Sequence, residues 1–251
     1  GFCGGCQLQH ITYEGQLSLK TQKVKDVIER IGHQNPDLVK PTLGPKEPWA
    51  YRNKMQMPVG GTKGDIQMGF YAMGSHDIVQ GTNCPIQDEG NNIIAQACYQ
   101  IAKEFDIEPY DEHTGKGVLR HIIGRIGQSG WMIILVTATE QLPYKEKWVE
   151  KLTERIPQVE TIVHNVNGKR TNVILGPKNN ILYGDGTITD HIKDLQFTLS
   201  PHSFFQVNPE QTTVLYDQAL EYADLKGDET VIDAYCGTGT ISLFLAHKAK
   251  H

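Results

Sequence analysis

Residues 228–246 contain the pattern that most restricts how this chain can fold. Residues 228–235 form a run typical of a buried strand, residues 236–239 a glycine-rich turn, and residues 241–246 the start of a helix. Strand, glycine turn and helix together make the first unit of a doubly wound, Rossmann-like sheet. One such unit cannot make a parallel sheet, so we expect the domain that it starts to continue beyond residue 251.

The composition of this turn indicates what it binds. Its glycines let a ligand approach the backbone, and the helix that follows favours polar or anionic groups at its N-terminus. The pattern Asp-x-x-Cys-Gly-x-Gly lacks the third glycine of dinucleotide-binding turns. Asp233 before the turn, with Gly237 and Gly239 inside it, suits S-adenosylmethionine, which has no pyrophosphate. Nucleotide binding and plain packing are the alternatives.

A second informative segment lies just upstream. Phe204 and Phe205 precede Gln206, and Asn208-Pro209 fits an N-cap and first helical position, so we expect a helix to about residue 222. The aromatic and amide side chains could place a stacking ring and a hydrogen-bonding group beside a ligand. They fit a packed core and a surface amide equally well.

The part of the chain before residue 200 has the pattern of an α+β domain, in which locally paired strands are separated by helices. The expected helices cover residues 16–31, 90–106 and 144–156, and the expected strands cover residues 51–58, 66–71, 118–126, 131–137, 160–166, 171–175, 180–183 and 195–199. We therefore divide the chain into a central domain over residues 1–195 and the beginning of a second domain over residues 196–251. The first helix could pack on that second domain.

Composition excludes several classes of protein. A hydrophobic content of 39% and a charged content of 21% are ordinary for a globular protein. No apolar run approaches the roughly 20 residues of a membrane helix, and no signal peptide is recognisable. The five cysteines are an odd number, and Cys98 and Cys236 lie within apolar runs, which argues against a disulfide scaffold. We expect a cytoplasmic monomer that does not bind membranes.

Charge is distributed unevenly along the chain. The net charge of −5 does not by itself indicate a nucleic-acid partner. Residues 1–64, however, contain nine Lys or Arg against five Asp or Glu, so this segment is at +4 and the rest of the chain at −9. A basic region on an acidic protein can steer a polyanion, although a solvated helix face explains several of these lysines equally well.

Three cysteines are candidate metal ligands. Cys3 and Cys6 are separated by two glycines, which tolerate the backbone angles that turn both sulfurs toward one metal. Cys84 is a third candidate, and a fourth is not obvious. The spacing alone leaves three interpretations open: a structural zinc site, a redox-active pair of cysteines, or no function at all.

Taken together, these motifs resemble the bacterial 23S ribosomal RNA (uracil-5-)-methyltransferases. The resemblance covers essentially the whole chain and depends on several segments in a fixed order. They are Cys3-Gly-Gly-Cys6-Gln-Leu-Gln-His10, Gly69-Phe70-Tyr71 with Asp77-Ile78-Val79, Leu119-Arg120-His121, Phe204-Phe205-Gln206-Val207-Asn208 and Asp233-Ala-Tyr-Cys-Gly-Thr-Gly239.

The resemblance implies an architecture and a set of ligands. It implies an α+β central iron–sulfur domain followed by the start of an α/β Rossmann-like methyltransferase domain that uses S-adenosylmethionine. A 4Fe–4S cluster would be held by Cys3, Cys6 and Cys84, with a fourth cysteine preceding Gly1. Gln206 and Tyr235 would contact S-adenosylmethionine beside the turn, and Phe204 would contact the 23S ribosomal RNA.

The implied reaction forms 5-methyluridine. A thiolate adds to carbon 6 of uracil, carbon 5 attacks the sulfonium methyl group, and a base removes the carbon-5 proton before the thiolate leaves. The family's nucleophilic cysteine and general-base glutamate fall after residue 251. We therefore assign no catalytic residue here, and expect this chain, as a fragment, to be inactive alone. There are two alternatives. One is a tRNA uracil-C5 methyltransferase, against which the cysteine set argues. The other is a non-catalytic RNA-binding module that carries zinc.

Overall fold

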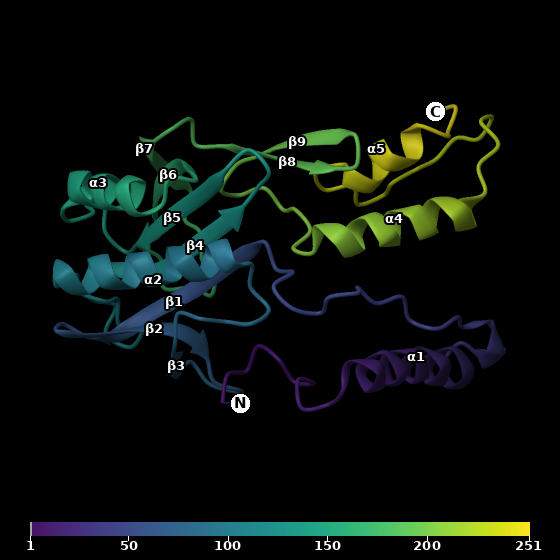
Figure 1. The fold of residues 1–251 in the computed structure, drawn as a ribbon, viewed down its shortest axis with the longest axis horizontal. Helices are drawn as coiled ribbons and strands as arrows, with labels where there is room; N and C mark the ends of the chain where they lie inside the picture. The colour runs from purple at the N-terminus through teal and green to yellow at the C-terminus, as the bar shows by residue number, and fades with distance from the viewer. Residues whose placement is uncertain (1) are drawn as a thin grey trace.

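A computed structural model describes residues 2–251 and is organised around a seven-stranded mixed sheet (Figure 1). The strands follow the spatial order β3-β2-β1-β4-β5-β6-β7. Their bounds are β1 (Lys54–Thr62), β2 (Asp65–Tyr71), β3 (Ile78–Gln80), β4 (Leu119–Ile126), β5 (Trp131–Thr137), β6 (Val159–Val166) and β7 (Lys178–Tyr183). Neighbouring strands are antiparallel except β5 and β6, which are parallel.

The central strand β5 is buried on both faces. Successive side chains of a strand point to opposite sides of the sheet. Ile133 and Leu135 accordingly enter one core, and Ile134 and Val136 enter the other, all of them with 0% exposure. The sheet therefore needs a covering layer on each side.

Two helices cover the first face. They are α2 (Glu89–Glu104) and α3 (Lys145–Arg155), which lie side by side over the sheet (Figure 1). Asp88 caps α2 by accepting a hydrogen bond from the amide of Gly90, and the apolar side of α2 is buried around Ile94 and Ile101. Trp148 of α3 is completely buried in the same core. Because α3 connects β5 to β6, it provides the crossover that a parallel pair requires.

The C-terminal third of the chain covers the opposite face. It contains a two-stranded ribbon, β8 (Ile188–Ile192) with β9 (Leu195–Leu199), and two helices, α4 (Pro209–Ala223) and α5 (Thr240–Ala246). Asn208 caps α4 by accepting a hydrogen bond from the amide of Gln211 at 3.1 Å. Tyr216 of α4 packs against Phe244 of α5 with ring centroids 5.5 Å apart. Both rings join the core that contains Ile134.

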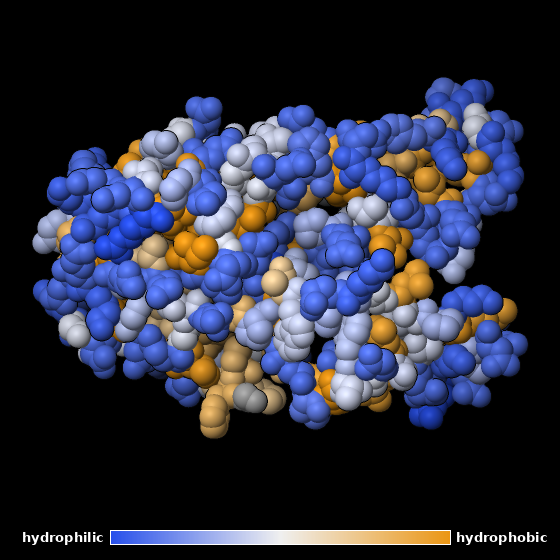
Figure 2. Space-filling view, viewed as in Figure 1, coloured by the Kyte–Doolittle hydropathy of each residue, from blue (hydrophilic) through white to orange (hydrophobic). Residues whose placement is uncertain are grey.

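The N-terminal helix α1 (Tyr13–Arg30) extends away from the sheet, and the 3-10 helix η1 (Pro36–Leu38) follows it (Figure 1). Helix α1 has no buried residues. The hydroxyls of Thr21 in α1 and Thr42 lie 2.8 Å apart and connect the helix to the chain that returns to the sheet. Figure 2 shows apolar residues along the hollow that separates α1 from α4. None of the helices within residues 2–251 is both long and apolar enough to span a membrane.

Most predicted elements are confirmed within a few residues, but three expectations need correction. The strand expected over residues 171–175 is not formed, and β3 and β8 were not predicted. Residues 228–235 do not form a strand, and Ile232 is 85% exposed, because no described strand lies beside them to pair with. The expected α+β class is corrected to an α/β fold with a mixed sheet, since hydrophobic periodicity does not reveal that β5 and β6 pair in parallel.

Candidate functional site

The glycine turn is folded against the start of α5. Asp233 accepts hydrogen bonds from the Ser242 hydroxyl at 2.6 Å and from the Tyr235 amide at 3.3 Å. Gly237 and Gly239 have φ values of 56° and 76°, in the left-handed region that side chains disfavour. The sequence signal for a tight turn at this place is therefore confirmed, although the strand before it is absent from the described structure.

The fold brings the glycine turn beside the aromatic segment that was predicted independently of it. The hydroxyl of Thr238 donates to the backbone carbonyl of Phe204 at 3.3 Å. Phe204 is 67% exposed and Tyr235 97% exposed, so both rings are free to contact a ligand. Phe205 instead packs in the core, with its centroid 5.5 Å from that of Phe197. The two adjacent phenylalanines thus have different roles.

The backbone on either side of Gln206 is fixed by the residue that precedes β1. The amide of Asn53 donates to the carbonyl of Val207 at 3.0 Å, and its side chain reaches the carbonyl of Gln206 at 3.5 Å. The side chain of Gln206 is partly exposed. The segment that carries Phe204 and Gln206 is therefore anchored to the central sheet, whereas the turn at residues 233–239 reaches it from the C-terminal helices.

Positive charge is concentrated under this segment, and sequence reasoning did not assign it a role. Lys54 of β1 lies directly opposite Arg125 of β4, and Arg125 donates to the carbonyls of Pro201 and Ser203. Burial, together with the charges of Arg125 and Arg52, lowers the pKa of Lys54 to about 8. The alternation of Arg52 and Lys54 along a strand was the available signal, because it places both on one face.

The three predicted metal-ligand cysteines also come together. The amide of Gly4 donates to the carbonyl of Tyr71 at 2.8 Å, which attaches the Cys3–Cys6 loop to the end of β2. The amide of Cys84 donates to the side chain of Asn92 in α2 at 2.9 Å. Burial raises the pKa of the Cys6 thiol, and the neighbouring Cys84 and Cys3 raise it further.

These three thiols are soft donors of the kind that both zinc and iron–sulfur clusters take. In the part of the chain that the structure describes, no three His, Cys, Asp or Glu side chains are placed to hold one metal ion. A zinc ion needs its ligands to converge on one point, whereas a 4Fe–4S cluster takes each thiolate on a different iron atom. The sulfur donors suit either centre in chemistry, but three are one fewer than the four ligands that each usually takes.

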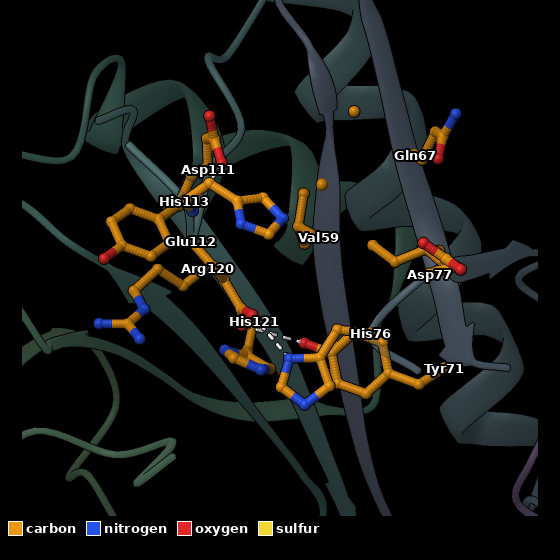
Figure 3. Close-up of a pocket in the computed structure, with 14 residues that line it drawn as sticks. Val59, Gln67, Tyr71, His76, Asp77, Asp111, Glu112, His113, Arg120 and His121 are labelled. Atoms are coloured by element: carbon orange, nitrogen blue, oxygen red, sulfur yellow. Dashed lines mark hydrogen bonds and ion pairs between the residues drawn. The ribbon is translucent and has the colours of Figure 1, made fainter. Parts of the chain in front are cut away.

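A cavity of about 370 Å³ lies at another part of the sheet, against β1, β2, β4 and the loop before β4 (Figure 3). Glu112 is its central acidic group: it accepts hydrogen bonds from Nδ1 of His76 at 2.7 Å and from the Tyr71 hydroxyl at 3.3 Å. The rings of Tyr71 and His76 are stacked, with centroids 4.7 Å apart. Burial would raise the pKa of Glu112, but its hydrogen bond from His76 lowers it overall.

Two buried residues of β4, Arg120 and His121, also line this cavity. The guanidinium of Arg120 lies 4.4 Å from the ring centre of Tyr110 and donates to the carbonyls of Asn167 and Lys169. Burial, together with the charge of Arg120, lowers the pKa of His121 to about 4 in spite of the nearby Glu112. His121 is therefore neutral at pH 7. The sequence singled out Leu119-Arg120-His121 only through its resemblance to a family.

No protein-family model matches the chain. An uncharacterized RNA methyltransferase of Halalkalibacterium halodurans is 52% identical over 251 residues, which are 99% of this chain and 55% of that protein. Proteins of the same name from Clostridium tetani and Listeria innocua are 50% and 48% identical. The chain is similar to proteins named RNA methyltransferases. It spans about half the length of these relatives.

A solved structure shares the fold. It is the tRNA (uracil-54, C5)-methyltransferase of Pyrococcus abyssi in complex with S-adenosyl-L-homocysteine. The match has a TM-score of 0.75 and 23% identity, and covers 98% of this chain and 57% of that one. At this identity the likeness concerns the fold.

Burial of neutral His121 predicts a pH-dependent stability. The folded-state pKa of about 4 lies below the ordinary value of 6.5, so the stability from this residue is complete above pH 6.5 and is lost as the pH falls toward 4. Between pH 7 and pH 5 the free energy of unfolding should fall by about 2 kcal/mol less in His121→Gln than in the wild type. Urea unfolding at the two pH values measures this. Replacing exposed His202 with Gln should leave the wild-type pH dependence, and an unchanged dependence in His121→Gln would contradict the assignment.

Proposed function

We propose that this sequence belongs to an S-adenosylmethionine-dependent RNA methyltransferase that forms 5-methyluridine in 23S ribosomal RNA. The observation that carries the proposal is the meeting of two separate motifs, where Thr238 of the glycine turn contacts the backbone of Phe204. Similarity to a named RNA methyltransferase along 99% of the chain supports methylation of RNA. The fold match to a tRNA (uracil-54, C5)-methyltransferase bound to S-adenosyl-L-homocysteine agrees with uracil-C5 methylation and with the cofactor, while its substrate is that of the alternative enzyme.

The residues at this meeting point have distinct proposed roles. The cofactor supplies an electrophilic methyl group. Gly237 and Gly239 leave the backbone open to it, Asp233 fixes the turn through Ser242, and Tyr235 and Gln206 provide an exposed ring and an amide for contact. The ring of Phe204 is placed to stack on an RNA base next to the same site.

The positive charge beneath this segment fits an RNA substrate. Arg52 and Lys54 lie close to Arg125, and no acidic side chain forms an ion pair with any of the three among residues 2–251. Uncompensated cations next to exposed aromatic rings are the combination that binds single-stranded nucleic acid. Of the basic residues in segment 1–64, Arg52 and Lys54 lie at this place, whereas four others lie on α1, away from the sheet.

Deleting the gene from its host tests the substrate. We expect 5-methyluridine to disappear from 23S ribosomal RNA and to persist in tRNA, as measured by mass spectrometry of nucleosides from the two purified RNAs. Loss from tRNA alone would contradict the ribosomal assignment and favour the tRNA enzyme. Persistence in both RNAs would contradict uracil-C5 methylation as a whole.

Replacing Tyr235 tests the cofactor site. Tyr235→Ala should weaken binding of S-adenosyl-L-homocysteine about tenfold, because a ring contact worth about 1.4 kcal/mol is lost. Isothermal titration calorimetry of the purified chain measures the change. Tyr222→Ala is the matched control, since Tyr222 is an exposed tyrosine on the outer part of α4 at 70% exposure. Equal affinities in the two variants would contradict the role of Tyr235.

We further propose that Cys3, Cys6 and Cys84 hold a 4Fe–4S cluster that shapes the RNA-binding surface, because methyl transfer moves no net electrons. Anaerobic reconstitution should give visible absorbance together with iron and acid-labile sulfide. Cys84→Ser should lose most of both, since only two thiol ligands would be left. Cys236→Ser, which changes an exposed cysteine outside the group, should retain them. A colourless protein loaded with zinc would contradict the cluster.

A further inference from the structure

The cavity beside Tyr71 and His76 is not explained by the proposed methyl transfer. It contains none of the residues assigned to S-adenosylmethionine or to the cluster, although the Gly4–Tyr71 hydrogen bond places it next to the cysteine loop. We propose that this cavity binds an unpaired guanine base of the RNA substrate, a base other than the modified uridine. This inference rests on the proposed RNA substrate and deepens it.

The cavity offers an aromatic surface for a base. Tyr71 and His76 are nearly coplanar, with an interplanar angle of 12°, and the side chain of His76 is 64% exposed. The outer face of the His76 ring is therefore available to stack on a further ring. Unpaired RNA bases are commonly held by stacking on tyrosine or histidine. At about 370 Å³ the cavity is large enough for a base.

Glu112 selects among the bases. Its carboxylate is ionised at neutral pH because the hydrogen bond from His76 lowers its pKa in spite of partial burial. The hydroxyl of Tyr71 is a fixed donor to it, since burial raises the pKa of this phenol to about 12. An ionised carboxylate only accepts hydrogen bonds, and its two oxygens can accept more than the two they already have. Guanine presents two adjacent donors, N1–H and the N2 amino group, whereas uracil presents one donor between two acceptors.

Within residues 2–251, two buried nitrogens near Glu112 lack hydrogen-bond partners. Nε of Arg120 and Nδ1 of His121 are buried and have no hydrogen-bond partner within the described chain. Arg120 is 4% exposed and His121 8% exposed, and both line the cavity (Figure 3). Buried polar groups without partners are costly, so their presence at a cavity wall indicates a ligand. Nε of Arg120 is a donor, and Nδ1 of neutral His121 is a donor in one of its two tautomers. The O6 and N7 atoms of guanine are acceptors suited to such donors once a small side-chain shift opens the two nitrogens to the cavity.

A phosphate or a metal ion fits this cavity less well. Asp77, Asp111 and Glu112 give it three carboxylates, which repel a phosphate group. Among residues 2–251, no three histidine, cysteine or carboxylate side chains are placed to hold one metal ion, and this includes those that line the cavity. A neutral base with donors for the Glu112 carboxylate and acceptors for the Arg120 guanidinium matches both of these groups.

Nucleotide titrations test the inference on the intact 251-residue chain. GMP should shift the imidazole resonances of His76 and His121 in a ¹⁵N-labelled sample. IMP, which lacks only the N2 amino group, should bind about tenfold more weakly. AMP and UMP should cause no saturable shift. Equal shifts with AMP or UMP, or no shift with GMP, would overturn the proposal.

A charge-matched pair of variants assigns the selectivity to one carboxylate. Glu112→Gln should abolish the difference between GMP and IMP, because an amide presents a donor where guanine also donates. Glu108→Gln removes an equal charge at an exposed position outside the cavity, and should keep the difference. If Glu112→Gln still bound GMP more tightly than IMP by the wild-type factor, Glu112 would be excluded as the residue that selects guanine.

This test is separable from that of the proposed function. Binding of GMP is read on the purified chain, whereas loss of 5-methyluridine is read in the host. Selective GMP binding together with persistent 5-methyluridine would support the guanine pocket and overturn the methyltransferase. Loss of 5-methyluridine without GMP binding would support the enzyme and overturn the pocket.

Discussion

The parallel pairing of β5 with β6 is the constraint on which the rest of the structure depends. It requires a crossover, which α3 provides, and it buries β5 between two cores. The central side chains of β5 are fully buried on both faces of the sheet, so neither face is exposed to solvent at this strand. The helices α2 and α3 must therefore cover one face, and the C-terminal ribbon and helices must cover the other. Both proposed sites lie where this sheet meets its loops.

Arg125 links the central sheet to the proposed cofactor and RNA segment. It extends from β4, opposite Lys54, and binds the carbonyls of Pro201 and Ser203 just before Phe204. Burial lowers its pKa to about 10, which leaves it charged at neutral pH. Its Nε has no protein partner in the described chain, as is also true of Arg120 five residues earlier. The same strand thus supplies a buried cation to each of the two sites, at opposite parts of its length.

Local pattern was sufficient to predict the helices and most strands. The Asn208 cap and the amphipathic faces of α2 and α3 are set by neighbouring residues, so they could be read from the sequence, whereas the Asp88 cap was not predicted. The short strand β3 gave too little periodicity to be recognised, and β8 exists because it pairs with β9. Residues 228–235 were predicted as a strand that the structure does not contain. Their composition is typical of a strand, but a strand forms only where a neighbour accepts its hydrogen bonds.

The sequence by itself determined the types of chemistry that this protein contains. The glycine turn, the aromatic residues 204 and 235, and the three thiols were recognisable from the sequence, but whether the two rings are exposed was not. Only the tertiary structure decided which of them meet. Thr238 reaches Phe204 across 34 positions, and Glu112 reaches His76 across 36, because the sheet brings distant segments together. Burial of His121, Arg120 and Lys54 likewise depends on packing against other strands, and no local pattern of charge or hydrophobicity encodes it.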